Sequence, residues 1–250
     1  MTTKVGMLLL LFSCSLAFNS YANTLRISLA QLPLHAYKGF LDEPRGTFVD
    51  LVQAMDAVYP EGKLTIKIYP FARSLENVIT GRADVHIPLI KAPNFKEEGL
   101  PYTFASEIMG VVTFVLYSRA DKPPLDMNNL AQYTLSTMRG HKEFFPFEVT
   151  EDTGNIQGIE KVLRGRTDGY LIEQDTADNY IKTRKIKNIR RTYYSQFDFG
   201  VVIPTGPRQQ EIDNIISKLI RKLKEKGEIT RIFQVINTEF VDWQPYEMPW

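Results

Sequence analysis

The sequence has little cysteine, little net charge and few histidines. Among its 250 residues it has one cysteine and three histidines, and 30 basic against 29 acidic residues leave a formal charge of +1. This near balance provides no overall field to attract a polyanion, which argues against nucleic-acid binding. His35, His86 and His141 do not have the spacing of metal ligands. We therefore predict neither a metal nor a cofactor.

A long membrane-spanning run is also missing. The apolar run Met7–Phe18 covers 12 residues, whereas a spanning helix needs roughly 20. Lys4 precedes this run and Ser20-Tyr21-Ala22 follows it, which is the layout of a secretory signal peptide. We predict that residues 1–22 are a signal peptide cleaved after Ala22 and that the mature protein is periplasmic. Lipidation of Cys14 is the less favoured alternative.

The predicted cleavage would remove the only cysteine, Cys14, and the basic residue Lys4. The mature chain would then have no cysteine and equal numbers of basic and acidic residues. A disulfide, a thiol nucleophile and a cysteine-based metal site are all excluded in such a chain.

The mature sequence opens with an α/β pattern. Apolar and polar residues alternate in Leu25–Leu29 and again in Leu64–Tyr69, which predicts two strands. Between them, apolar residues from Phe48 to Val58 recur at three- and four-residue steps and predict an amphipathic helix. This order favours a parallel pair of strands joined by a helical crossover.

One local pattern occurs twice. Leu75–Val85 and Ile159–Gly169 both read as a helix, then Gly-Arg-x-Asp, then a strand. A glycine suits the left-handed position that ends a helix. We expect Asp84 and Asp168 to cap strand entries rather than to touch a ligand. The repetition favours two α/β lobes built alike.

Two β-rich runs, Gly110–Tyr117 and Phe197–Ile203, are candidates for strands that pass between the lobes. If both do so, residues 23–117 and 197–250 form a discontinuous first lobe and residues 118–196 form an inserted second lobe. Two crossing strands would make a hinge. The pattern of residues 211–233 predicts one terminal amphipathic helix with a solvated basic face.

Several short motifs then occur in a characteristic order. They are Gly46-Thr47-Phe48-Val49-Asp50-Leu51, Gly81-Arg82-Ala83-Asp84, the segment Leu130 to Gly140, Gly165-Arg166-Thr167-Asp168, and Phe199-Gly200-Val201. In this order the chain resembles the family 3 extracellular solute-binding proteins of amino-acid ABC importers. The resemblance implies a two-lobed periplasmic binding protein type II fold, with two hinge strands and an interlobe cleft. It further implies a monomer that captures a small polar solute, amino-acid-like or a small carboxylate, for a permease.

The resemblance implies a ligand site that is altered in the first lobe. Lys96 stands twelve residues beyond Asp84, where family members usually carry the arginine that grips a carboxylate. A lysine cannot provide the bidentate fork of an arginine. Glu173 stands five residues beyond Asp168, at the place of the acidic residue that accepts the ligand's ammonium. The ligand could therefore be a modified amino acid, another small carboxylate, a peptide fragment or a heterocycle.

Other candidate ligand contacts follow from position along the chain. Arg73 follows a predicted strand and opens a helix, and Arg139-Gly140-His141 has the same relative position in the second lobe. Both could meet an anion at the carboxyl ends of the strands. Tyr37 and Phe71 could form aromatic walls of the pocket.

We predict no enzyme, because the sequence has no G-x-S-x-G elbow, no P-loop and no dinucleotide fingerprint. Two alternatives stay open. One is a receptor that presents its closed form to a membrane sensor or chemoreceptor. The other follows from a resemblance to the periplasmic cyclohexadienyl dehydratases, in which Glu173 could serve as a general acid.

Overall fold

The computed structural model describes residues 23–93, 96–235 and 239–249. The predicted signal peptide, with Cys14, lies outside these ranges. Within them, no helix is both long and apolar enough to cross a membrane.

The first part of the chain forms a small parallel sheet. β1 (Asn23–Ala30) pairs in parallel with β4 (Gly62–Tyr69) along its whole length, and α1 (Thr47–Ala57) connects the two strands. The apolar stripe of α1 is buried, as its periodicity requires. The predicted β–α–β unit is thus confirmed. The same part also contains α2 (Phe71–Ile79), β5 (Val85–Ile90), β6 (Tyr102–Phe104) and the hairpin of β2 (Tyr37–Lys38) and β3 (Pro44–Arg45).

The middle of the chain repeats this construction. β8 (Leu135–Met138) lies between β9 (Thr150–Asp152) and β10 (Gly169–Glu173) and is parallel to both. α3 (Asn155–Leu163) and α4 (Gln174–Arg184) pack in this part of the molecule. The short helices η1 (Leu130–Gln132) and η2 (Lys142–Phe144) flank β8.

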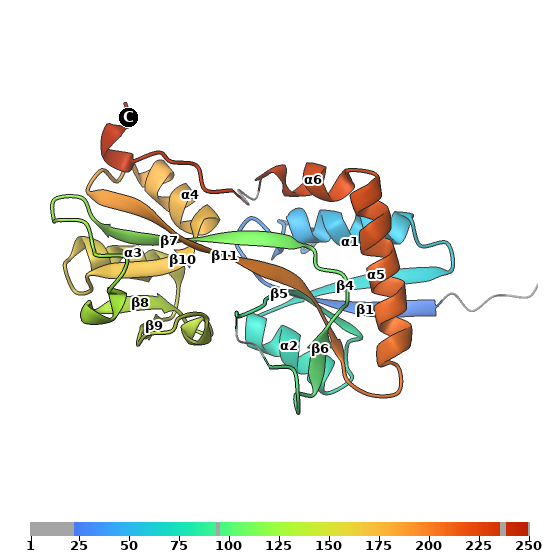
Figure 1. Ribbon diagram of the computed structural model, residues 1–250. Coiled ribbons are helices and arrows are strands. Elements are labelled where there is room, and N and C mark those ends of the chain that lie inside the picture. Colours follow the sequence, from blue (N-terminus) through green and yellow to red (C-terminus); the bar gives the residue numbers. More distant parts are fainter. Residues whose placement is uncertain (1–22, 94–95, 236–238, 250) are drawn as a thin grey trace, which may run out of the picture.

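The two parts are joined by a pair of long strands. β7 (Gly110–Arg119) and β11 (Ile189–Pro204) are antiparallel, and both run from one half of the molecule to the other (Figure 1). Among the described residues the sheet has nine strands, in the order β4-β1-β5-β11-β7-β10-β8-β9, with β6 added beside β11. The sheet is continuous because the two crossing strands pair with each other. Figure 1 shows α1, α2, α5 and α6 toward one end of this pair and α3 and α4 toward the other.

β11 is longer than the predicted run 197–203. It begins at Ile189, and its first residues pair with β7 before a register shift between Tyr193 and Ser195. The sequence pattern did not predict this added part, because the buried position at Arg191 is occupied by a charged residue and interrupts the apolar alternation. From Phe199 onward β11 pairs with β5. Two strands shared by both halves form the hinge of a two-lobed fold.

The repeated Gly-Arg-x-Asp motif has the same structure in both halves. Gly81 and Gly165 end their helices with φ of 69° and 64°, in the left-handed region. The Asp84 carboxylate accepts the Arg26 N–H at 2.9 Å, and the Asp168 carboxylate accepts the Thr134 N–H at 2.8 Å. Each aspartate therefore fixes the entry of its strand beside the central strand of its half.

The terminal helix is divided, contrary to the prediction of one helix over 211–233. α5 (Gln209–Glu225) ends before Gly227, whose φ is 69°, and α6 (Glu228–Ile232) follows, with η3 (Phe233–Val235) after it. A left-handed glycine cannot continue a right-handed helix. The basic face of α5 is exposed as predicted, and some of its charges pair with acidic side chains, including Lys218 with Glu61 at 3.1 Å.

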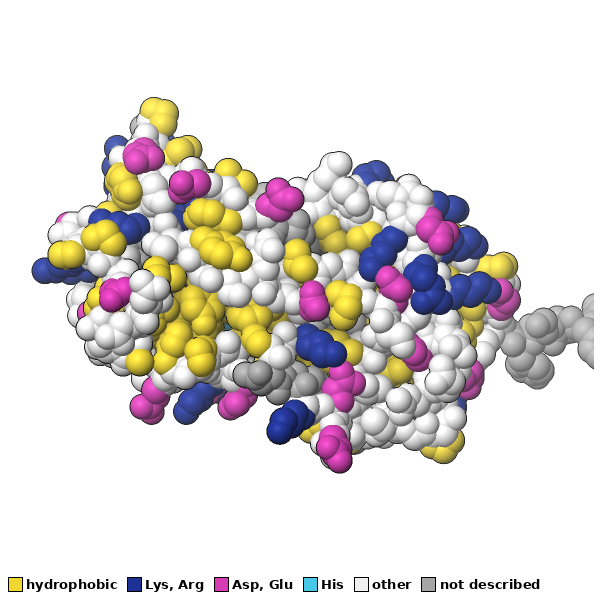
Figure 2. Space-filling model, viewed as in Figure 1, with side chains coloured by type: hydrophobic (Ala, Val, Ile, Leu, Met, Phe, Trp, Pro, Cys, Tyr) yellow, Lys and Arg dark blue, Asp and Glu magenta, His cyan; other side chains and the backbone are white. Residues whose placement is uncertain are grey.

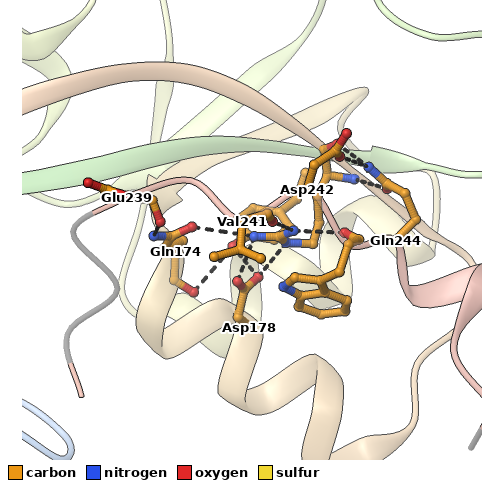
Figure 3. A network of polar contacts seen from close by, with 9 residues as sticks. Gln174, Asp178, Glu239, Val241, Asp242 and Gln244 are labelled. Carbon is orange, nitrogen blue, oxygen red and sulfur yellow. Dashed lines mark hydrogen bonds and ion pairs between the residues drawn. The ribbon is translucent and has the colours of Figure 1, made fainter. Parts of the chain in front are cut away.

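The last described residues, 239–249, lie against the second half and include η4 (Pro245–Glu247). The Arg191 guanidinium donates hydrogen bonds to the carbonyl oxygens of Val241 and Trp243 at 2.9 and 2.7 Å. The rings of Phe240 and Trp243 cover it at 5.0 and 4.3 Å. The Gln244 side chain bonds to both backbone groups of Arg191 (Figure 3).

The division of the chain into lobes stays a prediction. We propose that residues 23–117 and 197–235 form the first lobe. Because of the contacts with Arg191, we further propose that residues 239–249 belong with the second lobe, 118–196, although the sequence had suggested the first.

Candidate functional site

The predicted site residues of the second lobe follow neighbouring strands. His141 comes after β8 and Glu173 ends β10, and these two strands are parallel neighbours. Their side chains are thereby brought together, with His141 Nδ1 at 3.8 Å from Glu173 Oε2. Both atoms are buried and have no hydrogen-bond partner among the residues that the structure describes.

Burial determines the protonation of this pair. It lowers the pKa of His141 to about 4. Burial also raises the pKa of Glu173 to about 7. The hydrogen bond from the backbone of Glu173 opposes this rise, and the charge of Asp175 adds a smaller one. Near pH 6 both groups are therefore neutral, and at 3.8 Å they are too far apart for a good hydrogen bond. Within the described part of the chain, neither buried atom is thus satisfied by the other.

Arg139 and Gly140 lie at the exposed end of β8. Their backbone N–H groups, which were expected to meet a ligand carboxylate, are used within the chain. The Arg139 N–H donates to the Asp152 carbonyl at 2.9 Å, and the Gly140 N–H donates to the Glu151 carboxylate at 2.7 Å. Arg139 stays a predicted ligand contact through its side chain. The prediction for Gly140 stays untested, but its N–H group already has a partner within the chain.

In the first lobe, Phe71 and Arg73 lie in the first turn of α2, directly after β4. The Phe71 ring packs edge-on against His86 at 5.5 Å, and the Arg73 guanidinium lies 5.8 Å from the centre of the Tyr69 ring. Arg73 and Glu173 thus belong to different halves, as predicted. That they face one solute stays a prediction.

The other two first-lobe candidates are more peripheral. Tyr37 is an exposed residue of the β2–β3 hairpin, where it pairs with Arg45. Lys96 is exposed. A nearby lysine, Lys91, pairs with Glu97 at 3.0 Å instead of being directed to a solute. Among the described residues, no hydrogen bond, ion pair or ring contact joins Tyr37 or Lys96 to another candidate.

A pocket of about 260 Å³ lies between the two halves. Pro93 contributes from the first half, Phe144 and Phe145 from the second, and Tyr194 and Phe197 from the crossing strand β11. The pocket is lined by residues from both lobes and the hinge: Pro93, Glu143, Phe144, Phe145, Pro146, Tyr194, Ser195 and Phe197. A solute here would contact residues of both halves and of β11.

The wall of this pocket belongs to an aromatic cluster, which we define as Phe114, Phe144, Phe145, Phe147, Tyr194 and Phe197. Phe114 and Phe197 pack edge to face at 4.8 Å, and Phe145 lies 5.5 Å from Tyr194. The His141 ring lies 5.1 Å from Phe144, so the cluster reaches the His141–Glu173 pair. Figure 2 shows hydrophobic side chains gathered on the second half near its boundary with the first.

A second pocket, of about 370 Å³, lies between the β2–β3 hairpin and β4. Its lining residues, Lys38, Asp42, Pro44 and Ile66 to Tyr69, all belong to the first half. A solute bound there would contact one lobe, so it would have no reason to favour a closed form.

The aromatic residues of the 260 Å³ pocket were not among the predicted site residues. Phe144-Phe145-Pro146-Phe147 directly follows the predicted site residues 139–141, and this dense aromatic run was an available signal. Tyr194 and Phe197 carried no such signal, because only the pairing of β11 with β7 places them opposite the loop. Within the described ranges no three His, Cys, Asp or Glu side chains gather into a possible metal site.

No protein-family model and no curated protein matches this sequence. Solved structures, in contrast, match most of the chain. A histidine kinase sensor domain with similarity to periplasmic binding proteins superposes with a TM-score of 0.70 at 14% identity, over 87% of this chain and 97% of that one. The probable amino-acid ABC transporter extracellular-binding protein YtmK from Bacillus subtilis gives 0.68 at 15% identity, over 87% and 99%.

The chain has a periplasmic-binding-protein fold. A third protein with this fold is an ancestral amino-acid-binding protein described as a precursor of cyclohexadienyl dehydratase, with a TM-score of 0.65 at 16% identity over 85% of this chain and 94% of that one. The predicted fold class, two α/β lobes joined by two hinge strands with a cleft between them, is confirmed. In this periplasmic-binding-protein fold the 260 Å³ pocket opens at the hinge, between the lobes.

Proposed function

We propose that this protein captures a small, polar, amino-acid-like solute between its two lobes, in the periplasm, and presents it to an ABC importer. The observation that supports this most is the pocket lined by Pro93 of one lobe, Phe144 and Phe145 of the other, and β11 of the hinge. Amino-acid ABC transporter binding proteins share the fold.

Closure would follow from this placement. A solute that contacts both lobes has more contacts in the closed form, so it shifts an open–closed equilibrium by its differential affinity for the two states. β7 and β11 are the elements that would bend, and the register shift at Tyr193 and Ser195 interrupts their pairing near the crossing point. Arg73 and Glu173 lie outside the lining of this pocket, and in this proposal they approach the solute from opposite lobes only when the lobes close.

Binding without turnover is part of the proposal. A thermal-shift screen of the mature protein against amino acids, organic acids and amines tests it, because a solute at 100 times its dissociation constant should add about 2.7 kcal/mol. Mass spectrometry after prolonged incubation should recover the stabilising solute unchanged. A protein that no solute stabilises would contradict the proposal.

A second candidate function is sensing. A histidine kinase sensor domain shares the fold over 97% of its own length. Deletion of the gene separates the two roles: loss of uptake of the bound solute supports transport, whereas intact uptake with a lost transcriptional or chemotactic response supports a receptor for a membrane sensor.

A third candidate is dehydratase-like catalysis. Burial raises the pKa of Glu173 to about 7, which suits a general acid at neutral pH. Recovery of a dehydrated product, abolished by Glu173→Gln, would favour this function over binding.

A further inference from the structure

The interlobe pocket has an aromatic wall. Phe144, Phe145, Tyr194 and Phe197 line it, and Phe144 and Phe145 are each 8% exposed, so their rings are already held in the aromatic cluster before any solute binds. Fixed rings offer flat apolar surface, and their faces attract cations. A wall of this kind favours a solute with an aromatic or apolar body.

The charge at the pocket is acidic. Glu143 is its charged lining residue, and Ser195 adds a neutral hydroxyl. No lysine or arginine is among the described lining residues. The basic side chains nearby in sequence, Arg139 and Lys142, are exposed beyond the lining.

The groups that could bind a ligand carboxylate either have partners within the chain or lie outside the pocket lining. The Gly140 N–H donates to the chain's own Glu151. On the first lobe, Lys91 pairs with Glu97, and both Arg73 and Lys96 lie outside the lining residues. A ligand carboxylate in this pocket would face Glu143 without a basic partner.

We propose that the pocket selects small organic amines with an aromatic or apolar body, whose ammonium is held near Glu143 and the ring faces and whose recognition needs no carboxylate. This inference rests on the proposed solute-binding function and assigns it an amine in place of an amino-acid-like solute. It differs from amino-acid recognition because the carboxylate is a disadvantage here.

Three probes with the same phenyl ring test the inference: phenethylamine, L-phenylalanine and 3-phenylpropionate, titrated into the mature protein by calorimetry. Phenethylamine should bind at least tenfold more tightly than the other two. Glu143→Gln and Phe145→Ala should each weaken phenethylamine binding about tenfold or more. Glu148→Gln, an exposed carboxylate in the same loop, and Phe40→Ala, 99% exposed on the hairpin, are matched controls that should leave it unchanged.

The outcomes distinguish a failure of this inference from a failure of the proposed solute-binding function. L-arginine and L-histidine are tested in the same way. If any of these amino acids binds more tightly than phenethylamine, the amine preference is overturned, while the solute-binding function is supported. Phenethylamine binding that neither Glu143→Gln nor Phe145→Ala changes would place the amine elsewhere and overturn the pocket assignment. Because Glu143 is exposed, its variant is expected to fold even if Phe145→Ala does not. Failure of every probe and every amino acid to bind would overturn both proposals.

Discussion

Arg191 and Asp178 form a buried, bidentate ion pair in which Nε donates to Oδ1 at 2.8 Å and Nη2 donates to Oδ2 at 2.7 Å. The Arg191 side chain is 0% exposed and that of Asp178 5%. The Tyr117 hydroxyl donates a further hydrogen bond to Asp178 at 2.7 Å. Through Arg191 this pair connects α4, β11 and the C-terminal residues 239–249 (Figure 3).

Replacing Arg191 by alanine should therefore destabilise the protein by about 3–5 kcal/mol, because it leaves the Asp178 carboxylate buried without its cation. Urea unfolding of the mature protein measures the loss. Lys187→Ala, an exposed cation between α4 and β11, is the control and should change stability by less than about 0.5 kcal/mol. Equal effects of the two substitutions would show that the pair does not hold the C-terminal segment in place.

Asp84→Asn tests the strand cap of the first lobe. Burial alone would raise the pKa of Asp84, but hydrogen bonds from the Arg26 side chain and backbone, with the charges of Arg26 and Arg208, hold that pKa below its ordinary value. The ionised carboxylate thus contributes stability above the ordinary aspartate pKa of about 3.9, and this contribution is lost as the pH falls through the lowered value.

The expected loss for Asp84→Asn is about 1–3 kcal/mol at pH 7, shrinking as the pH falls below about 4. Denaturant unfolding at several pH values measures it, with the exposed Asp42→Asn as the matched control. A loss that stays constant down to pH 2.5 would show that the charge of Asp84 is not what fixes the strand.

Glu173→Gln should stabilise the protein, and more so at higher pH. Because burial raises the pKa of Glu173 to about 7, the folded state holds a proton that the unfolded state releases near pH 4.5, and stability falls between these values. The gain from the variant should be small at pH 5 and reach the order of 3 kcal/mol at pH 8.

His141 does not obscure this comparison. Burial lowers its pKa to about 4, so it is neutral in both folded proteins from pH 5 upward and affects them alike. Unfolding free energies of the two proteins at pH 5 and pH 8 make the measurement. A difference that does not change with pH would mean that Glu173 is already ionised at pH 5 in the folded protein.

Local patterns in the sequence were sufficient for most of the fold. The apolar periodicity gave α1 and β4, and the two Gly-Arg-x-Asp motifs gave matching helix ends and strand entries, because such features depend on neighbours within one or two turns. The break at Gly227 was overlooked because the apolar stripe resumes beyond it.

Contacts between distant segments could not be predicted in this way. The burial of Arg191 depends on residues 50 and 52 positions further along the chain, and nothing near Arg191 indicates them. The meeting of Phe145 with Tyr194 likewise requires the pairing of β11 with β7. His141 and Glu173 were each predicted as site residues, but their meeting also requires the parallel pairing of β8 with β10.

Small-angle scattering of the mature protein tests the central claim, that a solute held between the lobes draws them together, most directly. With a saturating amount of the solute that stabilises it best in the thermal-shift screen, the radius of gyration should decrease, because β7 and β11 allow the lobes to close. Glu173→Ala should raise the solute concentration that is needed for this decrease. It should not change the radius of gyration of the unliganded protein. An unchanged radius at full saturation would contradict the account.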